Sequence, residues 1–301
     1  MGMEVGTNLL NKVLKSMPYN AIIFDIDNVL VDTRASYTDC IRKTVDEYLK
    51  TVLRFSPSRK PLFTRLDVEQ FKSLGGFNDD WDTCYGLLLY ALSLKPARHA
   101  VRELIKEKNI SEFVNSVRDR PLGVKGIETM LTKTVRAIHE LPLLPQISKI
   151  FQHYYLNEYV WNEKLLIPKI YFRKMKQKGL KIGIVTGRNR EEANFALRRF
   201  QIDSFIDAMT TTDETPPGRK KPDPFGLLRV AKIFGKNLRY LYVGDLPDDI
   251  LAAEAAKKQI NIKSCGFLIA STSLKEMETN LKSAGADYVC QSVQELIKFV
   301  L

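Results

Sequence analysis

The most constraining feature of the sequence is the stretch Ala21–Leu30, in which four apolar residues run into two acidic residues placed two apart. An apolar run bounded by turn residues is typical of a strand buried in a parallel sheet. Asp25 and Asp27 would lie on the same face at the carboxyl end of this strand, where open α/β sheets bind ligands. Two carboxylates this close repel each other unless a cation or a shared proton relieves them. The stretch therefore predicts a metal-dependent active site.

Size and charge narrow the class of protein. The 301 residues have room for one large or two moderate domains, with the composition of a soluble globular protein. Residues 166–301 carry 23 basic and 15 acidic side chains, so most of the net charge of +11 lies there. A positive field attracts anions. Because the basic residues are interspersed with acidic and apolar ones, we expect a small phosphorylated substrate as partner and no nucleic acid. No apolar run has the length of a membrane span, so we expect no membrane partner.

The four cysteines and three histidines are too scattered to predict a zinc site. Buried reduced thiols are expected instead, as in a cytoplasmic protein. The start of the chain lacks the pattern of a secretory signal, and residues 7–17 have the apolar spacing of an amphipathic helix. Nothing in the sequence indicates an oligomeric state.

The pattern of apolar residues divides the chain into two kinds of structure. Residues 35–165 show successive helical patterns and hardly any strand pattern, whereas residues 166–301 alternate between helix and strand. Such alternation is typical of a Rossmann-like parallel sheet. We therefore predict the α/β class, with a core of residues 1–34 and 166–301 and an inserted, mostly α-helical domain of residues 35–165. The linkers 30–35 and 162–168 would form a two-stranded hinge.

Three later stretches place polar residues just beyond a predicted strand. They are Thr186-Gly187-Arg188, Lys221 before a proline, and the acidic turn from Asp245 to Asp249. Taken singly, each has an ordinary structural interpretation: a strand end, a solvated basic turn and a helix N-cap with acidic residues favouring the helix dipole. Taken together, they would lie at one edge of one sheet beside Asp25. Carboxylates of Asp25 and Asp245 are suitable ligands for Mg²⁺.

The order of these motifs (DxD, TGR, KP and GDxxxD) resembles that of the haloacid dehalogenase-like (HAD) hydrolase superfamily. The tail Gly285-Ala286-Asp287-Tyr288-Val289 resembles its phosphoglycolate-phosphatase-like branch, subfamily IA. The resemblance covers residues 19–34 and 166–301, and the position of the insert marks it as an enlarged helical cap of the C1 class. The implied fold is a Rossmann-like HAD core with this cap inserted after the first strand.

The resemblance also implies a reaction. Asp25 would attack phosphorus to form an aspartyl-phosphate, and Asp27 would act as general acid and then as general base. Mg²⁺ would be bound by the carboxylate of Asp25, the backbone carbonyl of Asp27 and Asp245, with Asp249 assisting directly or through water. The implied activity is that of a magnesium-dependent phosphatase, a phosphoric monoester hydrolase, acting on a small phosphorylated metabolite.

A second group of residues would bind the phosphate of the substrate. Thr186, the backbone near Gly187, Arg188 and Lys221 supply hydrogen-bond donors and positive charge. Lys221 is preferred to Lys220 because it directly precedes the proline. Asn28 stands where the family usually has glycine, and asparagine tolerates a left-handed backbone better than most residues.

Two alternatives stay open. A phosphomutase acting on a sugar phosphate needs the same nucleophile and acid, and a catalytically silent binding protein would keep the fold alone. Halide displacement is not expected, because the dehalogenases lack an acid at the position of Asp27.

The insert contains one unusual segment, residues 75–82, with the sequence Gly-Gly-Phe-Asn-Asp-Asp-Trp-Asp. It is either a specificity loop or a solvated acidic turn at the start of a core helix. In the first case Phe77, Asn78 and Trp81 would contact the organic part of the substrate. Arg34 and Tyr37, just past the predicted hinge, are further candidates for substrate specificity.

Overall fold

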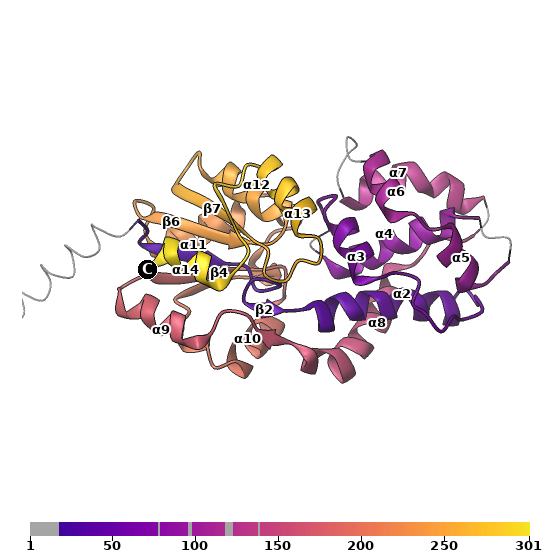
Figure 1. Cartoon of the computed structure of the whole chain (residues 1–301), viewed down its shortest axis with the longest axis horizontal. Coiled ribbons are helices and arrows are strands. Elements are labelled where there is room, and N and C mark those ends of the chain that lie inside the picture. The colour runs from indigo at the N-terminus through magenta and orange to yellow at the C-terminus, as the bar shows by residue number, and fades with distance from the viewer. Residues whose placement is uncertain (1–17, 78, 96–97, 118–122, 138) are drawn as a thin grey trace, which may run out of the picture. The chain divides into compact units, whose positions relative to one another are not determined.

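The computed structural model describes residues 18–77, 79–95, 98–117, 123–137 and 139–301. The helix predicted for residues 7–17 lies outside these ranges. The chain forms two compact units (Figure 1), one of residues 1–32 with 164–301 and the other of residues 33–163. Below they are called the sheet unit and the helical unit. Within the described ranges, none of the helices combines the length and apolar character needed to cross a membrane.

The sheet unit is built on six strands that are all parallel, which confirms the predicted α/β class. Their order is β5-β4-β1-β6-β7-β8, so the first strand of the chain lies inside the sheet. The strands are β1 (Ala21–Phe24), β4 (Lys181–Val185), β5 (Ala208–Thr210), β6 (Arg239–Gly244), β7 (Asn261–Phe267) and β8 (Tyr288–Cys290).

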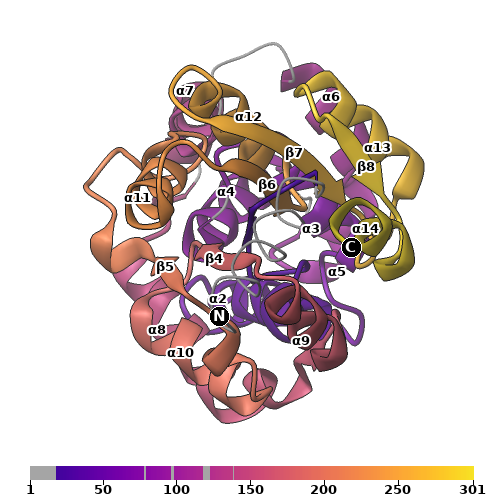
Figure 2. The same ribbon diagram turned by 90° about the vertical axis from the view of Figure 1, so that its left-hand side faces the viewer.

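Helices cover both faces of this sheet, because every strand side chain that is buried on either face needs an apolar neighbour. Ile22 and Phe24 of β1 pack in one cluster with α9, α10 and α14, whereas Ala21 and Ile23 pack in another with α11 and α12. Figure 2 shows these two groups of helices on opposite sides of the strands. α13 packs beside α12. The helices are α9 (Lys169–Gln177), α10 (Arg190–Arg199), α11 (Phe225–Phe234), α12 (Pro247–Ala256), α13 (Leu274–Ser283) and α14 (Val293–Val300).

The position of β1 determines where a ligand can bind. Phe24 is in register with Ile184 of β4 on one side and with Val243 of β6 on the other. The chain leaves β1 between two strands that come later in the sequence, which is the topological switch point of the sheet. The carboxyl ends of β4, β1 and β6 are therefore neighbours, and the predicted motifs follow these three strands.

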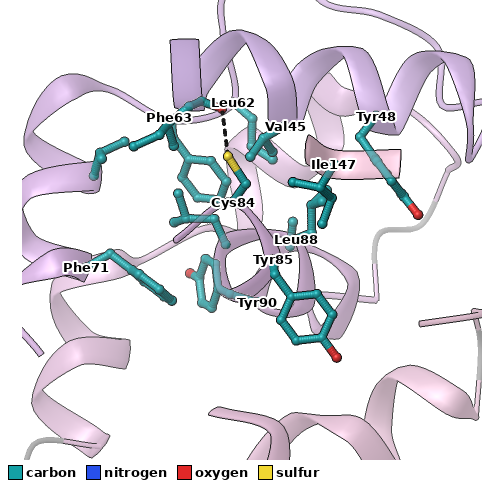
Figure 3. Packing of buried hydrophobic residues seen from close by; sticks show 14 of the residues in the cluster. Val45, Tyr48, Leu62, Phe63, Phe71, Cys84, Tyr85, Leu88, Tyr90 and Ile147 are labelled. Atoms are coloured by element: carbon teal, nitrogen blue, oxygen red, sulfur yellow. Dashed lines mark hydrogen bonds between the residues drawn. The ribbon is translucent and has the colours of Figure 1, made fainter. Parts of the chain in front are cut away.

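The helical unit is organised around α4 (Asp80–Ser93), in which every side chain from Thr83 to Leu92 is buried. A helix that is apolar all round is a central helix. Figure 3 shows its Cys84, Tyr85 and Leu88 among side chains of the surrounding elements. The elements that contribute buried side chains to this core besides α4 are η1 (Arg34–Thr38), α2 (Asp39–Thr51), α3 (Arg65–Lys72), α5 (Val101–Glu107), α6 (Ile110–Val117), α7 (Gly123–Arg136), α8 (Leu144–Tyr154), η2 (Tyr155–Tyr159) and η3 (Val160–Asn162).

Two short strands flank the insertion. β2 (Val31–Asp32) and β3 (Lys164–Leu165) pair antiparallel, with Val31 opposite Leu165. Both belong to the sheet unit. The chain therefore leaves and re-enters the sheet unit through one paired ribbon, at the segments where the sequence predicts the linkers.

Candidate active site

The end of β1 buries Asp25 and leaves Asp27 partly accessible. Asp25 is 5% exposed, and its backbone N–H donates to the carbonyl of Val243 at 2.9 Å. Three residues after Asp25, the chain turns through Asn28, whose φ of 56° is left-handed as its residue type allows. The Asn28 amide donates to Oδ2 of Asp245 at 3.2 Å. The turn therefore connects the first acidic motif to the last.

Lys221 provides the positive charge beside Asp25. Its Nζ lies 3.1 Å from Oδ1 of Asp25 and 2.7 Å from Oδ1 of Asp249, and its side chain is 8% exposed. Burial by itself lowers the pKa of Lys221, but Asp249 and Asp25 together raise that pKa well above its usual value. The lysine is therefore a fixed cation. Burial raises the pKa of Asp25 to about 7, against the lowering effect of Lys221.

Asp249, in the first turn of α12, is the second buried carboxylate that contacts Lys221. Asp249 is fully buried, its Oδ1 accepts the Tyr242 hydroxyl at 2.6 Å, and its Oδ2 accepts the backbone N–H of Leu246 at 3.1 Å. Gly244 makes this approach possible, because a Cβ at this position would lie 2.3 Å from the Cβ of Asp249. The strand end and the first turn of the helix are therefore in direct contact.

Asp25, Asp245 and Asp249 form a carboxylate cluster, with one oxygen of each within 4.8 Å of the others. Three hard oxygen donors this close suit a divalent cation such as Mg²⁺. Both oxygens of Asp249 accept hydrogen bonds, from the hydroxyl of Tyr242 and from the backbone N–H of Leu246. The donor set fits a metal, with Asp249 tied mainly to Lys221 and Tyr242.

The end of β4 brings Thr186 and Arg188 to the same edge of the sheet. The N–H of Thr186, which is 5% exposed, donates to the carbonyl of Thr210, and its Oγ1 accepts the N–H of Arg188 at 3.2 Å. Gly187 between them is exposed. Arg188, predicted as a phosphate ligand, directs its Nε and Nη2 to Oδ1 of Asp27 at 2.9 and 2.7 Å. Its guanidinium is thus already bound to a carboxylate.

The specificity residues predicted in the helical unit lie in different environments. Phe77 is 1% exposed and packs on Phe71, and Tyr37 is 7% exposed and lies 4.4 Å from Tyr155 between ring centroids. These two placements contradict a role in contacting substrate, because both rings belong to the core of the unit. Trp81, in the first turn of α4, is 37% exposed. Arg34 opens η1 and is partly buried, and Asn78 lies outside the described residues.

One member of the site was missed by the sequence interpretation. Tyr242 lies in the middle of β6 and donates its hydroxyl to Asp249. A tyrosine inside a buried strand needs a hydrogen-bond partner for its hydroxyl. Its position three residues before Asp245 was therefore an available signal.

The chain matches the haloacid dehalogenase-like hydrolase family over residues 19–257. It is 24% identical over 245 residues to pyrophosphatase PpaX from Anoxybacillus flavithermus, covering 80% of this chain and 81% of that protein. A protein named "putative pyrophosphatase PpaX", from Caldanaerobacter subterraneus subsp. tengcongensis, is 28% identical over 127 residues, which are 42% of this chain and 54% of that protein. The chain thus matches about half the length of the second relative.

Solved structures share the fold. A structure titled "putative phosphoglycolate phosphatase", from Lactobacillus delbrueckii subsp. bulgaricus, superimposes with a TM-score of 0.62 at 18% identity, covering 95% of this chain and 99% of that one. Phosphatase Tt82 from Thermococcus thioreducens gives a TM-score of 0.57 at 21% identity, covering 87% and 98%. The resemblance noted in the motifs is confirmed, and the chain belongs to the haloacid dehalogenase-like hydrolase family.

Proposed function

We propose that this protein is a magnesium-dependent phosphatase that hydrolyses a small phosphorylated metabolite through an aspartyl-phosphate. The observation that carries the proposal is the setting of Asp25. It is a buried carboxylate at the switch point of the sheet, 3.1 Å from a fixed cation and within one cluster with Asp245 and Asp249. A carboxylate can serve as nucleophile toward phosphorus when neighbouring positive charge offsets the repulsion between anions.

Each residue of the site has a role in this proposal. Asp25 attacks phosphorus, and Asp27 protonates the leaving oxygen and then takes a proton from the hydrolytic water. Lys221 offsets charge on Asp25 and on the phosphoryl group. Thr186 and the backbone near Gly187 donate hydrogen bonds to the phosphate.

Asp25, the backbone carbonyl of Asp27 and Asp245 would hold Mg²⁺, and Asp249 would assist directly or through water. When bound, the ion would neutralise negative charge on the transferring phosphoryl group. The contacts of Asp249 with Tyr242 and Lys221 support a main role in holding the lysine against Asp25.

The charge of the chain and the names of similar proteins support a small phosphorylated substrate. The net charge of +11 favours an anionic substrate, and the relatives are named for pyrophosphate and phosphoglycolate. Both compounds are small anions that contain phosphate. The four cysteines are buried free thiols, which supports action in a reducing compartment such as the cytoplasm.

The helical unit is proposed to be the cap that selects the substrate. It is inserted between β2 and β3, whose pairing supports a hinge. Lids of this kind exclude water and complete an active site. Trp81 and Arg34 are the remaining described candidates for contact with the organic part of the substrate.

The test is a screen of phosphorylated metabolites for release of inorganic phosphate, with Mg²⁺ and with a chelator. We expect magnesium-dependent turnover of at least one small phosphate monoester and its loss in Asp25→Asn. The matched control is Asp203→Asn, which alters an exposed carboxylate of the sheet unit outside the site. Acid quenching should leave one phosphoryl group on the peptide that contains Asp25. Turnover that survives in Asp25→Asn would refute the mechanism, and conversion of a sugar phosphate into its isomer would identify a mutase instead.

A further inference from the structure

The ion pair between Arg188 and Asp27 is unusual in its geometry. Nε and Nη2 of the arginine both donate to the same oxygen, Oδ1, at 2.9 and 2.7 Å. The arginine side chain is 1% exposed and the Asp27 side chain 29% exposed. Among the described residues no hydrogen bond reaches Oδ2 of Asp27. One carboxylate oxygen is therefore held by a buried cation, and the other is left for a reacting group.

The arginine is itself held firmly by its backbone. Its N–H donates to Oγ1 of Thr186 at 3.2 Å, and its carbonyl accepts the N–H of Thr212 at 3.1 Å. The next residue, Asn189, caps α10 by accepting the N–H of Glu192 at 2.8 Å. A residue whose backbone is anchored in this way at a strand end can orient another side chain through a contact of its own side chain.

We propose that Arg188 is a positioning residue that orients Asp27 so that Oδ2 carries the transferred proton. The inference rests on the proposed function. It replaces the expectation that Arg188 binds phosphate, because two of its nitrogens are already bound to Asp27 and the cation beside Asp25 is Lys221.

The proton balance assigns Oδ2 one role in each step. In the first step Asp25 forms a bond to phosphorus, the bond from phosphorus to the leaving oxygen breaks, and the proton on Oδ2 moves to that oxygen. Asp27 is then a carboxylate whose charge lies beside the guanidinium, a charge-assisted contact. In the second step water gives a proton to Oδ2 and attacks phosphorus, which releases inorganic phosphate and restores Asp25.

The dependence of the rate on the leaving group distinguishes positioning of the acid from binding of phosphate. A 4-nitrophenolate leaves without a proton, whereas an alkoxide needs one. In Arg188→Met we expect kcat/KM for an alkyl phosphate to fall about 10- to 100-fold more than for 4-nitrophenyl phosphate, as a partial loss of acid catalysis. Asp27→Asn should show the same selective loss, and the double variant little more than Asp27→Asn alone. Free guanidinium should partly restore alkyl phosphate turnover in Arg188→Ala.

Two further variants keep the test decisive. Arg188→Lys retains a cation if the larger changes impair folding, and it should show a smaller selective loss. Arg190→Met is the matched control, because this guanidinium two residues away binds Glu214 and not Asp27. It should leave the ratio of the two kcat/KM values unchanged.

A readout without turnover tests the contact itself. The Nε–H resonance of Arg188 should move in Asp27→Asn, and an unchanged resonance would overturn the proposal. An equal loss on both substrates in Arg188→Met, with a raised KM, would also overturn it and assign Arg188 to phosphate. If the wild-type protein hydrolyses no phosphate monoester, this result would instead refute the proposed function, and the positioning role with it.

Discussion

Replacing Lys221 by methionine tests the charge balance of the site through stability. The substitution keeps an unbranched side chain one atom shorter and removes a buried ammonium that lies 3.1 Å from Asp25 and 2.7 Å from Asp249. At an effective dielectric constant of about 20, these contacts correspond to about 5 and 6 kcal/mol of Coulomb attraction. Much of this Coulomb attraction offsets the free energy cost of burying the charges. Breaking a buried pair from one side typically costs about 3–5 kcal/mol, which is the loss expected at neutral pH without metal.

The loss should depend on pH with a defined sign. Burial raises the pKa of Asp25 to about 7 from the ordinary 3.8, and Lys221 lowers it. Without the lysine the pKa rises further. Between the ordinary and the raised value the native state binds more protons than the unfolded chain, so stability falls as pH rises. The variant should therefore lose more stability relative to wild type at pH 8 than at pH 5, where Asp25 can take up a proton.

The assay must report on the sheet unit. Both tryptophans, Trp81 and Trp161, lie in the helical unit, so their fluorescence follows unfolding of that unit and serves as internal reference. Hydrogen exchange of peptides from β1 and β6, with a chelator present, measures the free energy of opening the sheet unit. Lys220→Met removes the same charge one residue earlier from an exposed position and should change stability by less than about 0.5 kcal/mol. Equal losses in the two variants, or a loss that does not depend on pH, would refute the reasoning.

Four other changes have defined outcomes. Gly244→Ala puts a Cβ 2.3 Å from that of Asp249, so we expect about 1–3 kcal/mol lower stability in hydrogen exchange and slower turnover; wild-type values would contradict the close approach. Asp245→Asn should weaken Mg²⁺ binding at least about 10-fold in calorimetry, and unchanged affinity would remove this ligand. Burial raises the pKa of Asp46 to about 6 from the ordinary 3.8, so the contribution of Asp46 to stability falls as pH rises to that value. Asp46→Asn should be about 3 kcal/mol more stable than wild type at pH 8 and unchanged at pH 4 by tryptophan fluorescence. Trp81→Ala should alter the preference among natural substrates more than 4-nitrophenyl phosphate turnover, whereas equal losses would indicate a structural role.

The parts of the protein that could be predicted are those encoded locally. The apolar run before Asp25 predicts a buried strand because the run is short and is bounded by turn residues. The turn at Asn28 follows from its own backbone preference, and it is left-handed in the structure. The expectation that the motifs share one edge follows because parallel strands all present their carboxyl ends on the same side.

Pairings between distant segments could not be predicted in this way. Arg188 and Asp27 are 161 positions apart, and no local pattern shows that the arginine turns to Asp27 and not to a phosphate. Phe77 is similar: its acidic, glycine-rich surroundings indicate a surface loop, yet its ring packs on Phe71 in the core of the helical unit. Burial of a single ring depends on which distant side chains surround it.

The sequence by itself therefore determined the α/β class, the family and the edge of the sheet that carries the chemistry, because apolar periodicity and motif order are properties of the chain. Only the tertiary structure decided how the charges are shared there: Lys221 lies between Asp25 and Asp249, and Arg188 binds Asp27. Each charged group binds the opposite charge that folding brings within about 3 Å, and Coulomb energy falls with distance in space, whatever the separation along the chain.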